Sequence, residues 1–332
     1  MKKLIKKLSL IIIVILITVN PAFSQANTDV KDLIDSMDTL ASSLAQSLPF
    51  NATIGLNWSD AYIGKLLSVP PHFGIGVTAG ATTLNAGSLQ GVLELFDFDL
   101  PINLPIGFPL PGYTVDARIG GFILPFDIGI KAGYLDNDFT DLIGVNVDYL
   151  LIGADIRYAI LNKKTSPVKL IVGLGYNYLR GGISTKIPDV AFEFDSGSGF
   201  TIDLKDSELG LEWHSTVIEL KTQVSFKIPI VTPYAGVGVS YSWTTAGFNT
   251  KTTLSVTGGS NGLDDIKDEL LEQLGIDASA TGFKAFINNT DFNIRAYGGF
   301  SFNMAFIKLD FTFMYNIKDS ALGATVGLRF QL

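Results

Sequence analysis

From Phe73 to Leu332, apolar residues recur at every second position in one segment after another. Successive side chains of a β-strand point to opposite faces, so this spacing predicts strands with one apolar face. Most of the segments have the roughly 9–11 residues that a tilted strand needs to cross a membrane. Ten such runs are present, beginning at Phe73, Val115, Phe126, Val145, Val168, Ile218, Ala235, Phe292, Ala305 and Leu322.

The two faces of these runs separate a membrane barrel from a soluble sandwich. Glycine is frequent on the polar face, whereas aromatic residues crowd the apolar face. A soluble sheet would instead expose dense Lys and Glu on its polar face. The pattern predicts an all-β, transmembrane, antiparallel up-and-down β-barrel with its apolar face toward lipid. The charged residues of the runs are then expected to line the lumen: Asp116, Arg118, Asp127, Lys131, Asp148, Asp155, Arg157, Lys169, Glu219, Lys221, Arg295, Lys308, Asp310 and Arg329.

The connections between runs alternate between tight turns and longer loops, as expected of a barrel with short turns at one rim. The long loops are predicted at residues 83–112, 181–211 and 244–290. Ten strands place both chain ends on the short-turn side, which is the periplasmic side in an outer-membrane barrel. Twelve strands are the alternative, if residues 50–58 and part of 89–100 also form strands.

Three local features are expected within this pattern. The apolar phase of the fourth run changes near Leu150 and Leu151, which predicts a β-bulge there. Residues 190–194 and 200–204 are separated by a glycine- and serine-rich turn and predict a hairpin. Residues 263–274 predict a short helix that ends at Gly275.

The N-terminus has the pattern of a secretory signal peptide, with four lysines followed by the apolar run Leu8 to Val19. That run is shorter than the roughly 20 residues of a spanning helix, although a signal anchor is the alternative. We predict a signal peptide over residues 1–24, followed by an amphipathic helix that ends at Pro49. Residues 25–71 are then a plug or periplasmic segment, and residues 72–332 are the barrel.

Composition narrows the classes of function. The chain has 47% hydrophobic and 17% charged residues, which is apolar for a soluble enzyme of 332 residues. The absence of cysteine excludes disulfides, thiolate zinc sites and iron–sulfur clusters. Removing the four lysines of the signal peptide takes the net charge from −8 to −12. That charge disfavours nucleic acid and anionic lipid head groups as electrostatic partners.

Only two histidines are available for acid–base chemistry, His72 and His214. His214 is the single candidate for a catalytic residue at the barrel rim, and its alternative interpretation is an interfacial residue. No nucleophile motif or paired-histidine zinc motif accompanies it. We therefore predict no catalytic, metal or cofactor site.

The final strand, residues 323–332, resembles the C-terminal assembly signal of bacterial outer-membrane barrels, with Phe330 and Leu332 on the lipid face. Residues 106–111 and 117–122 are similar to segments of uncharacterised families of such barrels. Residues 57–62, Asn-Trp-Ser-Asp-Ala-Tyr, resemble the hatch of outer-membrane long-chain fatty-acid channels. The resemblance covers residues 73–332 and implies outer-membrane localisation, with lipid and the barrel assembly machinery as partners.

We expect a non-enzymatic channel or transporter for small hydrophobic solutes, closed by residues 25–71 and lined by glycines that leave room for a solute. Because unpaired buried charges are costly, most of the lumen charges must be paired. The alternative is a structural or surface-interaction barrel, adhesin-like, with a closed lumen. Neither hypothesis involves a cofactor or nucleic acid.

Overall fold

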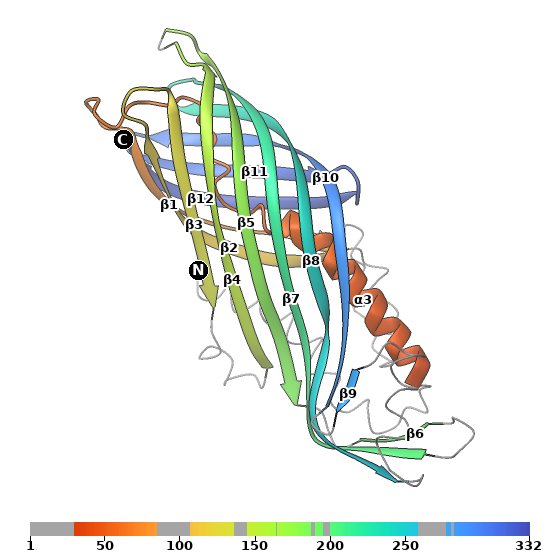
Figure 1. Cartoon of the computed structure of the whole chain (residues 1–332). Coiled ribbons are helices and arrows are strands. Elements are labelled where there is room, and N and C mark those ends of the chain that lie inside the picture. The colour runs from red at the N-terminus through yellow and green to blue at the C-terminus, as the bar shows by residue number, and fades with distance from the viewer. Residues whose placement is uncertain are drawn as a thin grey trace.

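The computed structural model describes residues 30–84, 107–135, 145–163, 165–186, 190–194, 200–257, 277–279 and 282–332. They form a closed antiparallel barrel of ten strands, preceded by one helix, α3 (Val30–Asn51) (Figure 1). The barrel strands are β1 (Phe73–Leu84), β2 (Phe108–Gly120), β3 (Phe126–Leu135), β4 (Val145–Leu161), β5 (Val168–Lys186), β7 (Phe200–Phe226), β8 (Val231–Thr257), β10 (Gly282–Met304), β11 (Ile307–Asn316) and β12 (Ala321–Gln331).

Hydrogen bonding between the first and last strands closes the sheet. β1 pairs with β12, and the remaining strands pair with their neighbours along the chain. Two short strands, β6 (Val190–Phe194) and β9 (Asp277–Ser279), lie outside this ring and pair with β7 and β10. The prediction of ten strands is confirmed. The twelve-strand alternative requires a strand at residues 50–58, but these residues are the end of α3 and an irregular segment. The other strand of that alternative, within residues 89–100, lies outside the described residues.

The barrel has its apolar face outward, as predicted. In β12 the outward side chains of Leu322, Val326, Leu328 and Phe330 are 41–49% exposed, whereas Arg329 on the opposite face is 2% exposed. The exposed apolar side chains form the surface that lipid covers.

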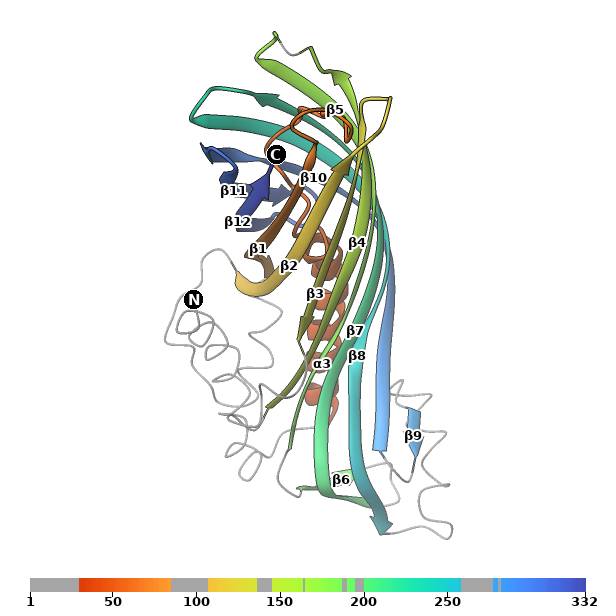
Figure 2. The ribbon, with the colours of Figure 1, turned by 90° about the vertical axis from the view of Figure 1, so that its left-hand side faces the viewer.

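One rim carries tight turns and the other carries the long ends of the strands. At the short-turn rim the amide of Leu332 donates to the carbonyl of Phe73 (2.9 Å), so the strand region begins and ends there. Strands β7 and β8 each have 27 residues and extend, with β10, far beyond the opposite rim (Figure 2). The expected hairpin is present there, because β6 pairs with the start of β7. The helix expected at residues 263–274 lies outside the described residues.

Helix α3 continues two residues beyond its predicted end. Pro49 lies inside its last turn, and the amide of Ala52 still donates to the carbonyl of Leu48 (2.8 Å). Proline removes one helical hydrogen bond. Packing outweighs that loss, because Leu48 and Phe50 are both 3% exposed inside the barrel. Among the described residues, no helix is long and apolar enough to cross a membrane.

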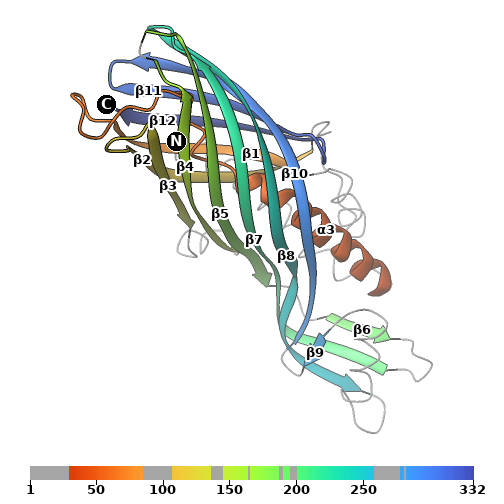
Figure 3. The same cartoon turned by 45° about the horizontal axis from the view of Figure 1, so that its top comes forward.

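The chain before β1 runs through the barrel. Helix α3 starts at the loop side and enters the ring, and the chain continues to the short-turn rim, where β1 begins (Figures 1 and 3). Side chains from Ala41 to Ile63 are mostly buried there. We call residues 52–72, between α3 and β1, the plug segment. The strand region begins and ends at the short-turn rim, as ten strands predict, whereas α3 begins at the other rim because it lies lengthwise in the lumen.

Candidate functional site: the filled lumen

The charged residues predicted for the lumen are nearly all buried inside the barrel. Thirteen of the fourteen are 9% exposed or less: Asp116, Arg118, Asp127, Lys131, Asp155, Arg157, Lys169, Glu219, Lys221, Arg295, Lys308, Asp310 and Arg329. Most of them lie between the middle of the barrel and the short-turn rim, and we call this part of the lumen the polar half.

Asp148 is the exception, and the prediction for it is wrong. Pairing of β4 with β5 runs without a break from Val145 to Ala159, and the irregularity lies between Ala159 and Leu161. No phase change occurs at Leu150 and Leu151, so Asp148 shares the outward phase of Ile152 and is exposed. Adjacent apolar residues mark a strand that is apolar on both faces here, not a bulge.

One centre of the polar half is Asp127, which lies between two guanidinium groups. Arg118 Nη1 and Arg157 Nη2 each approach an Asp127 carboxylate oxygen at 2.6 Å. Arg118 also contacts Asp155 at 2.8 Å, and Lys221 Nζ lies 2.9 Å from the same carboxylate. Because opposite charges meet at hydrogen-bonding distance, this buried network avoids the cost of isolated ions.

A second set of pairs lies on the opposite wall and reaches the plug segment. Arg295 pairs with Glu219, and Arg329 Nε lies 3.2 Å from Asp310. Lys308 pairs at 3.1 Å with Asp60, a residue of the plug segment itself. Burial alone would raise the pKa of Asp60, but Lys308, Lys227 and Arg329 together hold that pKa well below its ordinary value.

Three other side chains of the barrel wall donate hydrogen bonds to the backbone of the plug segment. Lys131 Nζ donates to the carbonyls of Ala52 (2.7 Å) and Ile54 (2.5 Å). Arg157 Nη1 donates to the carbonyl of Asp60 (3.2 Å). The amide of Gln223 donates to the carbonyls of residues 58 and 59 at 2.8 and 3.1 Å. These bonds satisfy carbonyls of an irregular segment that would otherwise be buried without partners.

Trp58 anchors the plug segment on the first strands. Its indole Nε1 donates to Asp116 Oδ1 (2.7 Å), and the guanidinium carbons of Arg329 and Arg118 lie 4.6 and 5.4 Å from its ring centroid. Cations at this range are attracted to the indole face. A methyl group at Gly74 would lie 2.7 Å from the Trp58 ring, so glycine is needed to admit it. The space that inward glycines leave is therefore filled here by the plug segment.

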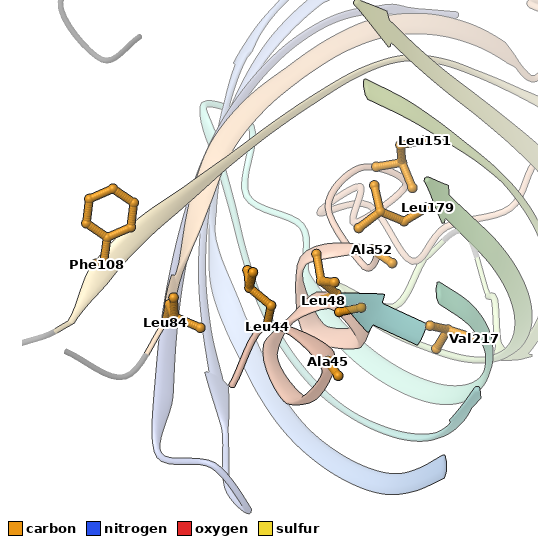
Figure 4. Close-up of a cluster of buried hydrophobic side chains, with 10 residues drawn as sticks. Leu44, Ala45, Leu48, Ala52, Leu84, Phe108, Leu151, Leu179 and Val217 are labelled. Carbon is orange, nitrogen blue, oxygen red and sulfur yellow. The ribbon is translucent and has the colours of Figure 1, made fainter. Parts of the chain in front are cut away.

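A cluster of apolar side chains lines part of the lumen nearer the loops. Leu151, Leu179, Val217 and Ala246 point inward from β4, β5, β7 and β8 and are each at most 1% exposed. They pack on α3 through Leu44, Ala45, Leu48 and neighbouring Ala52, as Figure 4 shows. We call this cluster, with Leu84 and Phe108, the apolar half. Sequence reasoning missed it, although the neighbouring apolar pair at residues 150 and 151 was a signal for an apolar inner face.

The two histidines lie in different surroundings. His72 is 4% exposed, with its Nε2 3.7 Å from Asp127 Oδ2, so it belongs to the polar half. His214 is exposed on β7, in the outward phase of Ile218. Within the described part of the chain, no group of three His, Asp or Glu side chains is arranged to hold a metal ion.

The described residues leave little free space around Trp58 in the polar half. A small cavity of about 10 Å³ lies beside Trp58 and Asp310, which is room for about one water molecule. The plug segment thus occupies the polar half and α3 occupies the apolar half.

No family model and no curated protein matches this sequence. Among solved structures, the outer membrane protease OmpT from Escherichia coli is 10% identical, with a TM-score of 0.41 over 80% of this chain and 99% of that chain. The translocator domain of autotransporter NalP from Neisseria meningitidis is 11% identical, with a TM-score of 0.37 over 92% and 100%. The toluene transporter TbuX from Ralstonia pickettii is 10% identical, with a TM-score of 0.26 over 79% and 89%.

TM-scores below 0.5 transfer no function, so the functional argument rests on the geometry of the lumen. The resemblance of residues 57–62 to a fatty-acid channel hatch stays a prediction.

Proposed function

We propose that this protein is a non-enzymatic outer-membrane channel for small apolar solutes, closed while α3 occupies the apolar half of its lumen. One observation carries the proposal: four neighbouring strands each direct an apolar side chain into that half, namely Leu151, Leu179, Val217 and Ala246, and α3 packs over them. A water-filled pore has a polar interior. An apolar inner wall instead suits a solute that replaces the apolar contacts of the helix.

Residues 52–63 and α3 contact the barrel wall in different ways, and this difference supports a movement of α3 while residues 52–63 stay in place. Residues 52–63 are held by ion pairs and by hydrogen bonds to their backbone. Along α3, the side chains of Leu44, Ala45 and Leu48 are held by apolar packing, and Asn51 in its last turn donates to Thr82 Oγ1 and to the carbonyl of Leu110. An apolar solute can replace the contacts of these side chains, whereas it cannot replace a charge partner of Asp60. The polar half is then an anchor and the apolar half a binding surface.

The experiment that tests the channel crosslinks α3 to the barrel wall with a linker that a reducing agent cleaves. The chain has no cysteine, so the pair Leu48→Cys and Val217→Cys can be joined by a cleavable bis-maleimide. Entry of the apolar dye phenylnaphthylamine into intact cells is the readout. We expect the crosslinked protein to block entry and reduction of the linker to restore it. Equal entry before and after reduction would contradict the channel.

A matched control uses the same chemistry on the outer face. The pair Ile218→Cys and Tyr241→Cys joins two exposed residues that face each other across β7 and β8. Crosslinking this pair should leave dye entry unchanged, since neither residue touches α3. A block by this pair as well would indicate a general effect of the linker.

The long strands favour a second function, that of a surface-interaction barrel with a closed lumen. β7, β8 and β10, of 27, 27 and 23 residues, are each more than twice as long as a membrane crossing requires. Planar-bilayer conductance of the full chain and of a variant lacking residues 28–71 separates the two. The channel requires conductance in the shortened variant, and silence in both forms would favour the surface function. In either case we propose that β12 is the strand recognised by the barrel assembly machinery.

A further inference from the structure

The turns at the short-turn rim are apolar at their tips, which is unusual for the water-facing end of a barrel. Side chains of six residues there are between 54 and 79% exposed: Leu67, Phe122, Ile123, Leu124, Ile230 and Phe306. They lie beyond strands such as β3 and β12, whose 10 and 11 residues already match one membrane crossing. These tips therefore reach the boundary between the acyl chains and the head groups, and large apolar groups in water there would be costly.

In the described turns of this rim, the side chains carry positive charge and no negative charge. Lys65, Lys163 and Lys227 are exposed in its turns. Residues 61–73, 120–126, 160–168, 226–233 and 302–307 contain no Asp or Glu. The net negative charge of the chain is therefore located elsewhere, and the expectation that it disfavours anionic head groups does not apply to this rim.

We propose that the short-turn rim binds anionic phospholipid of the adjacent leaflet, with the apolar tips among the acyl chains and the three lysines on the phosphates. Lysine side chains reach from apolar surroundings toward head groups through their flexible stems. Lipid is the occupant that the surface fits, because the exposed tips continue the outward apolar band. In β4, for example, exposed Tyr158 and Ile160 lead directly to exposed Leu161. This inference is independent of whether the barrel conducts solutes.

The test is native mass spectrometry of the full chain released from mixed micelles with equal amounts of phosphatidylglycerol and phosphatidylcholine. We expect the protein to retain phosphatidylglycerol preferentially. The variant Lys65→Gln/Lys163→Gln should lose that preference by about fivefold for each lysine replaced. It leaves Lys227 in place, because this lysine lies 5.6 Å from the Tyr62 ring and its contact with the plug segment is then kept.

The control variant is Lys186→Gln/Lys284→Gln, which removes two exposed lysines on the loop side of the barrel. It should keep the preference of the unaltered protein. A second variant, Phe122→Ser/Ile123→Ser, should lower the retention of both lipids without changing their ratio. Equal retention of the two lipids by the unaltered protein would overturn the proposal. An equal loss of preference in the control variant would also overturn it, because the preference would then depend on total charge and not on the lysines of this rim.

Discussion

The two halves of the lumen hold their contents by different means. In the polar half, Asp127, Asp155 and Glu219 pair with cations of the wall, and Lys131 and Arg157 reach the backbone of the plug segment. In the apolar half, leucines of α3 pack on leucines and a valine of the strands. Directed charge contacts fix one position, whereas apolar packing is not directional. In our proposal, the plug segment in the polar half is therefore the anchor, and α3 in the apolar half is the part that can be released.

The largest expected effect comes from removing the centre of the polar half. Asp127→Asn leaves Arg118 and Arg157 without their shared charge partner, and breaking a buried pair costs about 3–5 kcal/mol. The free energy of unfolding, measured by urea titration in detergent, should fall by that amount. Asp148→Asn is the control, because that exposed residue should change stability by less than about 0.5 kcal/mol. Equal effects would remove the anchor role.

A smaller effect with a distinct pH dependence is expected at Asp60. Because its pKa is lowered in the folded chain, its charge stabilises the fold above its unfolded pKa of about 4. This contribution is lost as the pH falls through the lower folded value. Asp60→Asn should destabilise the barrel by roughly 1.5–3 kcal/mol at pH 7.

The difference between Asp60→Asn and the unaltered chain should stay constant from pH 7 to about pH 5 and shrink below about pH 4. Unfolding midpoints across this range measure it. A difference that grows on acidification would contradict the pairing of Asp60 with Lys308.

Glycine substitutions compare positions that face the plug segment with positions that do not. A Cβ at Gly120 would overlap the carbonyl oxygen of Gly64 and lie 2.9 Å from His72 Cβ, so Gly120→Ala should cost about 1–3 kcal/mol. At Gly175 the nearest atom, Asp155 Cβ, lies 3.6 Å away, and alanine should be tolerated. Heat-modifiable gel migration gives the midpoints. If the two variants melt alike, the inward glycines do not make room for the plug segment.

The direction in which the N-terminal segment runs through the barrel can be tested without a measurement of stability. Because α3 begins at the loop side, Thr39→Cys, at an exposed position of α3, should react with an impermeant maleimide added outside intact cells. Val69→Cys, at a position that is 99% exposed on the short-turn rim, should react only after the membrane is opened. The opposite pattern would mean that the chain does not run through the barrel as described.

The outer face of this barrel was predictable because lipid requires an apolar side chain at every second position of each strand. The alternation from Leu322 to Phe330 satisfies this requirement. The inner face was predictable only in part. Its charged positions follow from the opposite phase, but their pairing with the plug segment depends on contacts between residues far apart in the sequence, such as Asp60 and Lys308, which are 248 positions apart. Trp58 alternated like a strand residue, and its anchoring role follows only from the cations that surround it.

The most direct test compares the reactivity of two single cysteines in the two halves. Leu48 and Ala61 are 3 and 0% exposed, in the apolar half and on the plug segment beside Ser225. We predict that Leu48→Cys reacts slowly with a small maleimide and faster when an apolar solute is added. Ala61→Cys should stay unreactive under both conditions. Equal protection of both cysteines with and without solute would contradict a releasable helix above a fixed anchor.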